Sequence, residues 1–395
     1  MSIPNKPSFF TLLIMISFAS VNAVLFTPAL PDIAKYFLIS SDVAQQTIIW
    51  YLVGYTIGQL FYGPIANRFG RKPALYIGIS LQILSSILCV GSGYLHSYSL
   101  LVIGRFLLAL GSGVGLQIAF TLVNEFYEPQ VASQKISYLI MAFAITPGLS
   151  IALGGILTEY FNWISCFDAS AVYGIILLLL VTQLPESSIC LDNNALKLKN
   201  LFRDYFFQFK NIQLVSGGLI MGGSSCFNYV FSAFAPFIAI KLSGMSSSEY
   251  GFLSLLPPIG LLIGSIVSAQ LAKVYDLKFL IKLGLAICTI SVIIMLLAML
   301  NHVRIIFSLF IPMTMIFFGL CFILANASTI AMSQVRNKSH GSSVLNFLNI
   351  GLATLVVFSL TYLPIKMLLM PSVFIIFILG MVFLYKILTK GFPGN

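Results

Sequence analysis

The residues of this chain with the most specific chemistry lie in one short stretch, Gly63–Pro73, whose sequence is GPIANRFGRKP. Arg68, Arg71 and Lys72 place three cations within five residues, between two long apolar runs. Such cations do not remain in hydrocarbon, so they hold the stretch at a polar surface. Their chemistry is therefore that of charges which hold a loop at one face of a membrane.

Four other residues of this stretch favour a turn. Gly63 and Gly70 allow close backbone approach and a positive φ. Pro64 tolerates a helix end, and Pro73 suits the first turn of a following helix. Each flanking apolar run is long enough to cross about 30 Å of hydrocarbon at about 1.5 Å per residue. The stretch is predicted to be a tight hairpin between two membrane helices.

Arg105 lies inside an apolar run, about 10 Å below the start of that run near Tyr98. A guanidinium at this depth costs about 3 kcal/mol on insertion scales, so it requires a polar cavity or partners. We favour a cation that lines a central cavity. The alternative is that the side chain reaches outward to the surface or caps nearby carbonyl groups.

Further polar residues could line the same cavity or could bond neighbouring helices to each other. They are Asn22, Gln117, Asn228, Tyr229 and Asn326. Of the eleven acidic residues, only Asp168 falls a turn inside an apolar run. No acid therefore opposes Arg105 in a central span, and proton coupling, if present, must use an unusual group or the substrate itself.

The composition excludes a soluble protein. Hydrophobic residues make up 59% of the chain and charged residues 8%, and the mean hydropathy is +1.00. So little polar surface requires the bilayer as solvent. The net charge of +10 is assigned to membrane topology and not to nucleic-acid binding, because the cations lie between apolar runs.

Enzymatic chemistry is not expected. The three histidines, His96, His302 and His340, fall in separate loops, and no phosphate-binding loop or Ser-His-Asp set is present. The six cysteines show neither a disulfide framework nor metal-ligand spacing. We therefore predict no catalytic residues, no metal and no cofactor.

Apolar windows predict an all-α membrane protein with twelve transmembrane helices. The predicted spans are 9–30, 47–66, 74–93, 99–122, 136–158, 164–184, 212–238, 250–272, 279–300, 303–330, 341–363 and 368–389. They divide into an N-terminal six-helix bundle (1–185), a cytoplasmic linker (186–211) and a C-terminal six-helix bundle (212–395). Within the linker, Leu196–Phe209 is either an amphipathic helix on the membrane surface or a loosely packed connector.

The two halves resemble copies of one another. Pro31-x-Ile33-Ala34 recurs as Pro236-x-Ile238-Ala239, an offset of 205 residues. A repeat near half the chain length predicts two bundles related by a pseudo-two-fold axis along the membrane normal.

The cations also predict the orientation. Lys35, Lys241, Arg304 and Lys366 fall on one side and Arg105 lies within a span, so sixteen of the 21 cations lie on the other side. The positive-inside rule places that side, with both termini, in the cytoplasm. Residues 9–23 also resemble a signal peptide, but cleavage there would remove half of the first span.

The turn carries a family resemblance. The pattern Gly63-x-x-x-Asn67-Arg68-x-Gly70-Arg71-Lys72 resembles the loop between the second and third helices of the major facilitator superfamily. The family usually has Asp where this chain has Asn67. In the family this loop locks the two halves together on the cytoplasmic side, so the resemblance implies a gating loop, whose electrostatic lock a neutral Asn67 would weaken.

Three more motifs are similar to those of the drug–proton antiporter branch. Pro28-Ala-Leu-Pro31-Asp32 resembles the end of the first helix in the bicyclomycin-resistance type, although Val24 stands where an acid is often found. Arg105 with Gly111-Ser-Gly113 resembles the fourth-helix motif, with Leu108 and Ala109 replacing the usual Gln and Gly. Pro147, Gly154 and Gly155 resemble the antiporter motif of the fifth helix, with Ala152 in place of a second Pro.

Together these observations predict a monomeric secondary transporter of a bacterial inner membrane that moves a small organic solute by alternating access. The resemblance implies efflux of a drug-like or metabolite substrate, and the lack of central acids favours a neutral or anionic one. The alternatives are uptake, export of a dedicated metabolite such as a siderophore, and a membrane sensor that does not transport.

Overall fold

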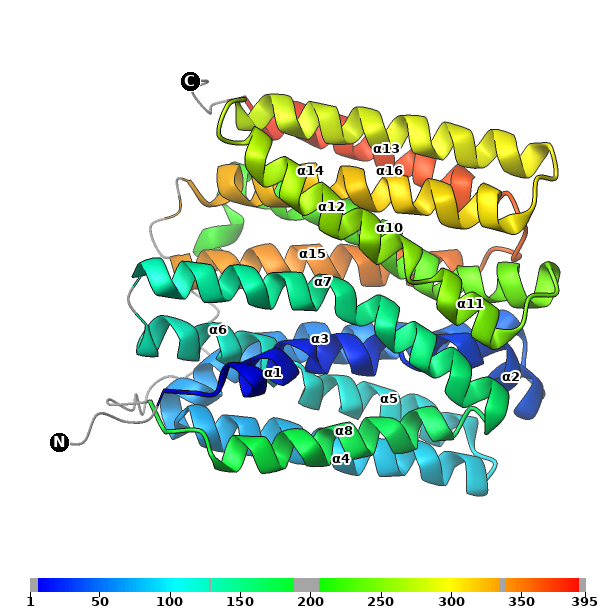
Figure 1. Ribbon diagram of the computed structural model, residues 1–395, viewed down its shortest axis with the longest axis horizontal. Helices are drawn as coiled ribbons and strands as arrows, with labels where there is room; N and C mark the ends of the chain where they lie inside the picture. Colours follow the sequence, from blue (N-terminus) through cyan, green and yellow to red (C-terminus); the bar gives the residue numbers. More distant parts are fainter. Residues whose placement is uncertain (1–5, 128, 188–205, 334, 336–337, 391–395) are drawn as a thin grey trace. The chain divides into compact units, whose positions relative to one another are not determined.

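The computed structural model describes residues 6–127, 129–187, 206–333, 335 and 338–390. Within these residues the chain is helical and contains no strand, and it divides into two compact units, Met1–Leu201 and Phe202–Asn395 (Figure 1). The division falls inside the predicted linker, of which 188–205 lie outside the described residues. The predicted bundle limits at 185 and 212 therefore stay predictions, and so does the surface helix expected at Leu196–Phe209.

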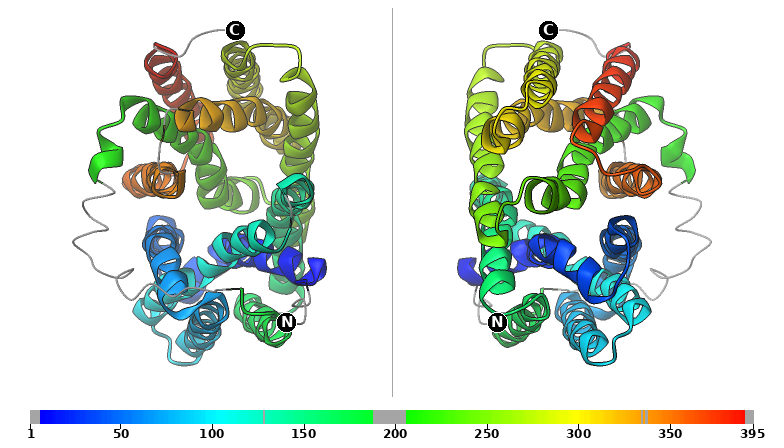
Figure 2. Two further views of the ribbon diagram at one scale, coloured as in Figure 1. Left: turned by 90° about the vertical axis from the view of Figure 1, so that its left-hand side faces the viewer. Right: turned by 90° about the vertical axis from the view of Figure 1, so that its right-hand side faces the viewer.

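Figure 2 shows the helices of the first unit nearly end on, as one bundle. Its elements are α1 (Phe9–Val24), η1 (Thr27–Ala29), α2 (Leu30–Tyr36), α3 (Ser41–Phe69), α4 (Arg71–Tyr94), α5 (Tyr98–Ser112), α6 (Val114–Phe126), α7 (Pro129–Tyr160) and α8 (Ser165–Thr182).

The second unit is also a helical bundle. Its elements are α10 (Ile212–Pro236), η2 (Phe237–Leu242), α11 (Ser247–Leu253), α12 (Leu256–Leu271), α13 (Leu277–Leu300), η3 (Ile306–Phe310), α14 (Ile311–Met332), α15 (Lys338–Leu360) and α16 (Leu369–Leu388).

These elements account for each of the twelve predicted spans. Several spans consist of shorter segments in succession, such as α1, η1 and α2 in the first and α5 and α6 in the fourth. Nine helices of the described residues are long and apolar enough to cross a membrane, and Val344–Leu360 is a shorter apolar helix. The prediction of an all-α fold with twelve membrane helices is confirmed.

The hairpin at Gly63–Pro73 is tighter than predicted. Helix α3 does not end at Pro64 but continues to Phe69, with Pro64 inside it. Gly70 alone forms the turn, with φ of 104°, and α4 begins at Arg71. The helix therefore continues three residues beyond the predicted span of 47–66, and Pro64 is accommodated inside it, because a proline removes one hydrogen bond but does not always end a helix. Pro73 lies in the first turn of α4, as predicted.

The first span is interrupted. Helix α1 ends at Val24, and the chain continues through the 3₁₀ turn η1, which contains Pro28, into α2. A helix that ends inside a bilayer leaves carbonyl groups without intrahelical partners, and no water is present there to bind them. Other groups of the unit must therefore supply donors at this point.

Three glycines allow close packing in the first unit. A Cβ on Gly54, Gly58 or Gly78 would lie within 2.8 Å of an atom of α5 or of Val114. The same contacts recur in the second unit, 206 residues later, between α12 or α13 and α14. Their glycines are Gly260, Gly264 and Gly284. The repeat that the sequence suggested is thus present in the packing of each unit.

Left-handed backbone conformations repeat as well. Leu38 and His96 have positive φ angles of 54° and 47°, and 206 residues later Gly244 and His302 have 72° and 51°. The histidines occupy the turns that follow α4 and α13, respectively. A rare conformation at matching positions is strong evidence for duplication, because few non-glycine residues adopt it.

The repeat offset changes from 205 to 206 residues between Pro236 and Gly244. The π-helix η2 lies at this place. A π turn contains one residue more than an α turn, so η2 accommodates the additional residue without a loop.

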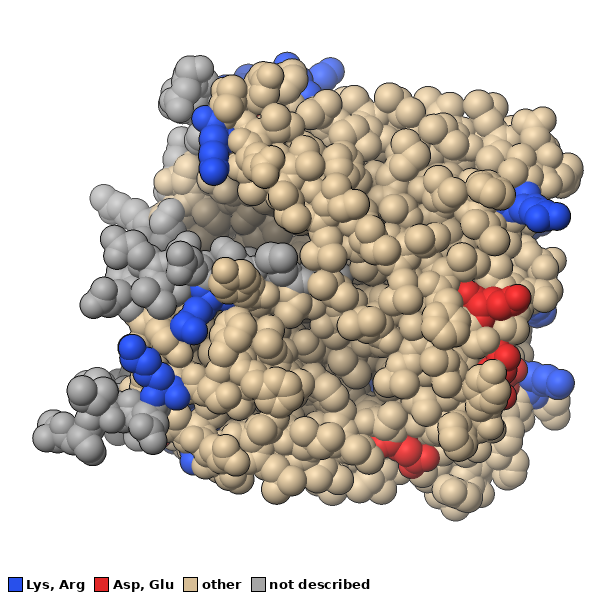
Figure 3. Space-filling view, viewed as in Figure 1, with Lys and Arg blue, Asp and Glu red and all other residues tan. Residues whose placement is uncertain are grey.

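Charge is nearly absent from the interior. In the part of the chain that the structure describes, Arg105 is the only charged side chain that is buried, with 1% of its surface exposed. In Figure 3 the visible Lys, Arg, Asp and Glu side chains lie toward helix ends, and the sides of the helices carry uncharged residues. This distribution is that of a protein whose helix flanks contact lipid.

Candidate functional site

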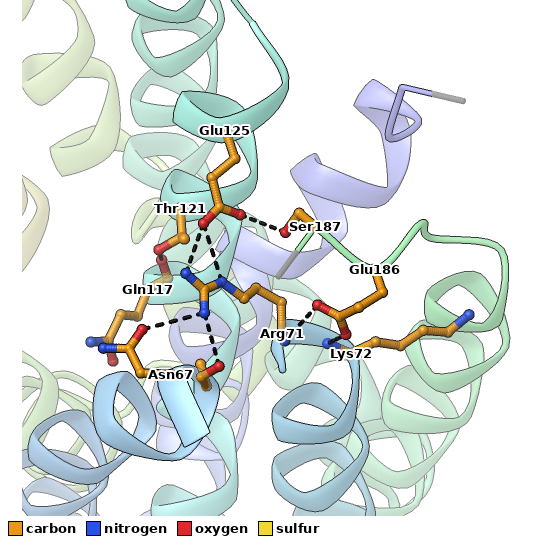
Figure 4. Close-up of polar contacts among 9 residues, drawn as sticks. Asn67, Arg71, Lys72, Gln117, Thr121, Glu125, Glu186 and Ser187 are labelled. Carbon is orange, nitrogen blue, oxygen red and sulfur yellow. Dashed lines mark hydrogen bonds and ion pairs between the residues drawn. The ribbon is translucent and has the colours of Figure 1, made fainter. Parts of the chain in front are cut away.

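The turn at Gly70 is surrounded by a polar network within the first unit, shown in Figure 4. Arg71 forms a salt bridge with Glu125 at the end of α6, with Nη2 2.7 Å and Nε 3.2 Å from Oε1. Its Nη1 donates to the carbonyl of Ala66 at 2.9 Å and to Oδ1 of Asn67 at 3.3 Å. Arg71 therefore fastens the end of α3 to the end of α6.

Asn67 takes part in this network as an acceptor. Its side chain is exposed and uncharged, so it adds less to the binding of Arg71 than a carboxylate would. The negative charge next to Arg71 comes instead from Glu125. Arg68 is also exposed and lies over the ring of Phe69, with Cζ 5.3 Å from the ring centre.

Glu186 caps the first turn of α4. Its Oε1 accepts from the backbone N–H of Arg71 at 3.0 Å, and its Oε2 accepts from that of Lys72 at 2.9 Å. Gly70, the N-cap residue, has no side chain to do this. Lys72 Nζ in turn donates to the carbonyls of Thr182 and Leu184 at 2.7 and 3.1 Å, at the end of α8.

Gln117 is half-buried beside α3, and its place in a cavity stays a prediction. Its Nε2 is 2.8 Å from the place that a Cβ on Gly63 would occupy, so the amide packs against the backbone of α3 at this glycine. Its Oε1 is buried and has no hydrogen-bond partner among the described residues. The carbonyl of Gln117 accepts from Thr121 Oγ1 at 3.0 Å.

Tyr127, which follows α6, holds the N-terminal segment. Its Oη donates to the carbonyl of Pro7 at 3.3 Å, and Nζ of Lys6 and of Lys135 lie 5.4 and 4.6 Å from its ring centre. Burial raises the pKa of the Tyr127 phenol above its ordinary value, so the hydroxyl stays protonated and can donate.

Arg105 bonds to the interrupted first span. Its Nη1 donates to the carbonyl of Asn22 at 2.7 Å, and its Nη2 donates to that of Ala23 at 3.3 Å. Nε lies 3.4 Å from the carbonyl of Thr47 in α3. The guanidinium thus joins α5 to α1 and α3, which corresponds to the capping alternative that the sequence left open.

These bonds complete the end of α1. The carbonyl of Val21 accepts from the N–H of Leu25, and that of Val24 accepts from Thr27 Oγ1. The two carbonyls between them, those of Asn22 and Ala23, are the ones that Arg105 binds. All of the last four carbonyls of α1 are therefore satisfied, and a cation at a helix C-terminus also interacts favourably with the helix dipole.

Two aromatic rings enclose the guanidinium. Cζ of Arg105 lies 3.9 Å from the ring centre of Phe26 and 4.3 Å from that of Tyr51. Tyr51 is itself fixed, because its hydroxyl donates to the carbonyl of Ala19 at 2.8 Å. Cation–π contacts of this kind stabilise a charge that has no carboxylate beside it.

Asn22 directs its side chain into the bundle. Its Oδ1 accepts from Gln82 Nε2 at 3.0 Å and from Ser170 Oγ, and its Nδ2 donates to the carbonyl of Phe18 at 2.8 Å. Gln82 also reaches Ser86 Oγ at 3.0 Å. The amide of Asn22 therefore bonds α1 to α4 and α8, which was the interhelical alternative for this residue.

Gly154 of the antiporter motif packs against the interruption in the first span. A Cβ on Gly154 would lie 1.7 Å from the carbonyl oxygen of Leu25. Pro147 lies inside α7 without ending it, and Gly155 is buried. The fifth span can therefore approach the first only because residue 154 has no side chain.

The predicted residues of the second unit lie in α10 and α14. Asn326 is buried and donates to the carbonyl of Phe322 at 2.8 Å. Asn228 and Tyr229 are half-buried in α10, and the carbonyl of Asn228 accepts from Ser232 Oγ at 2.9 Å. Their place in a cavity stays a prediction, as does that of Arg105.

The described residues contain no group of three or more His, Cys, Asp or Glu side chains that could hold a metal ion. None of the described acidic side chains is buried. Asp168, the acid that fell inside a predicted span, is exposed in the first turn of α8. What the site can do is bind and release helix ends.

Comparison with known proteins identifies the family. Residues 12–357 match the Major Facilitator Superfamily. The chain belongs to this superfamily. Multidrug resistance protein D of Escherichia coli is 30% identical over 156 residues, 40% of this chain and 39% of that protein. A bicyclomycin resistance protein homolog of Haemophilus influenzae is 20% identical over 270 residues, 68% of this chain and 67% of that protein.

The crystal structure of a D-xylose-proton symporter has the same fold, with a TM-score of 0.78 at 15% identity over 98% of this chain and 97% of that one. The recognition of a major facilitator protein of the drug-efflux type is thus confirmed. The superfamily consists of transporters, so the protein is a multi-pass membrane transporter and not an enzyme.

Apart from Asn67, the departures from the family pattern are apolar and buried. Val24 stands at the end of α1, and Leu108 and Ala109 are fully buried in α5. The methyl group of Ala109 lies 3.1 Å from the position of a Cβ on Gly54, so the two small residues pack together. Ala152 is buried in α7. The acid and the Gln that the family often has at positions 24 and 108 are therefore replaced by apolar side chains that pack between helices.

Proposed function

We propose that this transporter exports a small neutral or anionic organic solute from a bacterial cytoplasm by alternating access. Relatives named for multidrug and bicyclomycin resistance support efflux. The observation that carries the charge preference is the buried guanidinium of Arg105, in a chain whose described acidic side chains all lie outside the buried interior.

The carbonyls and rings around Arg105 stabilise its charge but do not cancel it, because they carry dipoles and quadrupoles and no net charge. A second cation about 8 Å away would be disfavoured by about 2 kcal/mol at an effective dielectric constant of about 20. That energy corresponds to about a thirtyfold lower occupancy. An anion at the same distance would be stabilised by a similar free energy.

The same imbalance affects energy coupling. A proton-driven exporter commonly carries its proton on an intramembrane carboxylate. Val24, at the position where related antiporters often have an acid, cannot do so. Export in this protein is therefore coupled to charge on the substrate or to a group other than a buried carboxylate.

The test is transport by the full-length protein in liposomes, with ethidium as a permanent cation, chloramphenicol as a neutral solute and salicylate as an anion. We expect transport of chloramphenicol or salicylate and poor transport of ethidium. Efficient ethidium transport that is unchanged by Arg105→Gln would contradict the proposal.

Two variants separate the charge of Arg105 from its capping of α1. Arg105→Lys keeps the charge but lacks the planar fork that reaches two carbonyls, whereas Arg105→Gln loses both. The Arg105→Lys variant should therefore still prefer anions, but it should transport them more slowly. Arg304→Gln removes an exposed arginine and is the matched control, for which we expect wild-type selectivity.

A further inference from the structure

We propose that Glu186 and Ser187, the first two residues of the predicted linker, fasten the linker to the turn at Gly70, so that this turn and the Arg71–Glu125 salt bridge open and close as one latch. The latch consists of Arg71, Lys72, Glu125, Glu186 and Ser187. It is a property of the first unit and does not depend on which solute is transported.

The first observation is that α4 lacks a cap of its own. Gly70 is its N-cap residue and has no side chain, so two backbone N–H groups of the first turn are bound only from outside, by Glu186. A carboxylate is the most favourable partner at a helix N-terminus. Gly70 has a φ of 104°, a conformation that favours glycine, and its lack of a side chain leaves room for Oε2 of Glu186, which would lie 2.9 Å from a Cβ there.

The second observation is that the capping is reciprocal. While Glu186 follows α8 and caps the start of α4, Lys72 belongs to α4 and donates to the carbonyls of Thr182 and Leu184 at the end of α8. The N-terminus of one helix and the C-terminus of the other are thus bound by each other's charged residues. Movement of either helix end along the membrane normal breaks both sets of bonds.

The third observation is that the carboxylate of Glu125 binds both Arg71 and the start of the linker. Oε1 of Glu125 binds the guanidinium of Arg71, while its Oε2 accepts a hydrogen bond from Ser187 Oγ (Figure 4). The start of the linker is therefore bonded to the same side chain that holds Arg71. If the bond from Glu125 to Arg71 or to Ser187 is lost, the Glu125 side chain is less fixed, and so is the residue that it still binds.

The test measures hydrogen exchange at the backbone amides of Arg71 and Lys72 in the full-length protein. Glu186→Gln removes the charge that binds these amides directly, and we expect their exchange to become about tenfold faster. Glu125→Gln and Ser187→Ala do not touch these amides. If the residues form one latch, each should still accelerate exchange there by about fivefold.

The control is Glu249→Gln. Glu249 caps α11 in the second unit, with Oε2 accepting from the N–H of Ser246 at 2.9 Å. Its loss should accelerate exchange at Ser246 only. The proposal is overturned if Glu125→Gln and Ser187→Ala both leave exchange at Arg71 and Lys72 within twofold of wild type, or if Glu186→Gln leaves it unchanged.

Discussion

Gly154→Ala is the substitution whose effect follows most directly from the structure. Gly154 lies in α7, and the added methyl carbon would stand 1.7 Å from the carbonyl oxygen of Leu25, half of the 3.4 Å at which ordinary contact begins. The atom in its way belongs to the backbone. It cannot rotate aside as the end of a side chain could, so α1 and α7 must separate.

Two effects of opposite sign contribute to the change in stability. Alanine favours a helix over glycine by about 0.5–1 kcal/mol. Overpacking that displaces backbone costs about 1–3 kcal/mol, and this overlap lies at the severe end. The separation also shifts the end of α1, whose Asn22 and Ala23 carbonyls Arg105 binds. We expect a net destabilisation of about 2–3 kcal/mol, or about 5–10 °C in the apparent unfolding temperature.

The assay is thermal unfolding of the purified protein in detergent. The quantity measured at each temperature is the fraction of protein that remains monodisperse. The matched control is Gly91→Ala in α4, where an added methyl group meets nothing within 4 Å. There only helix propensity acts, so the unfolding temperature should stay the same or rise. Equal unfolding temperatures for the two variants would refute the argument from close approach.

Three further predictions concern other parts of the first unit and the orientation of the chain. Arg105→Lys should lower the unfolding temperature, because an ammonium lacks the planar fork that binds both carbonyls at the end of α1. Thermal unfolding measures this change, and an unchanged unfolding temperature would argue against the capping role of Arg105. Asn67→Asp should strengthen the contact with the neighbouring guanidinium by about 1 kcal/mol and favour the outward-facing state, and labelling of periplasmic cysteines should then increase. Reporter fusions after Lys72, within 186–211 and after Asn395 should all indicate the cytoplasm, and a periplasmic signal at any of them would contradict the orientation.

The fold could be predicted from the sequence because the bilayer imposes strong rules on each span separately. A window of about 20 apolar residues is sufficient to locate a membrane helix, whatever it packs against. Gly70 could be identified for a similar reason, since a tight turn requires glycine, whereas Gly154 was identified only through the resemblance to the antiporter motif. Helix α3 extends three residues beyond the predicted span of 47–66, because the hydropathy window locates the apolar part of a helix and not its polar last turn.

The partners in the site could not be predicted, because the sequence does not show which distant residues meet. Glu125 binds Arg71 across 54 positions, and Glu186 binds the same residue across 115. The partners of Arg105 were still harder to predict, since its acceptors are backbone carbonyls, which every residue possesses. The only signal was the prolines at 28 and 31, which indicate that the first helix is interrupted nearby.

The two sites of the first unit use charge for the same purpose. Arg105 satisfies the carbonyls where α1 ends, Lys72 does so where α8 ends, and Glu186 satisfies the amides where α4 begins. Backbone groups at a helix end lack intrahelical partners, and at the buried end of α1 water cannot supply them either. Charged side chains at these ends hold the helices strongly while their bonds are intact, and they bind water once exposed to it. Side chains that stabilise a bundle in this way can also release it, which is what a transporter that changes conformation requires.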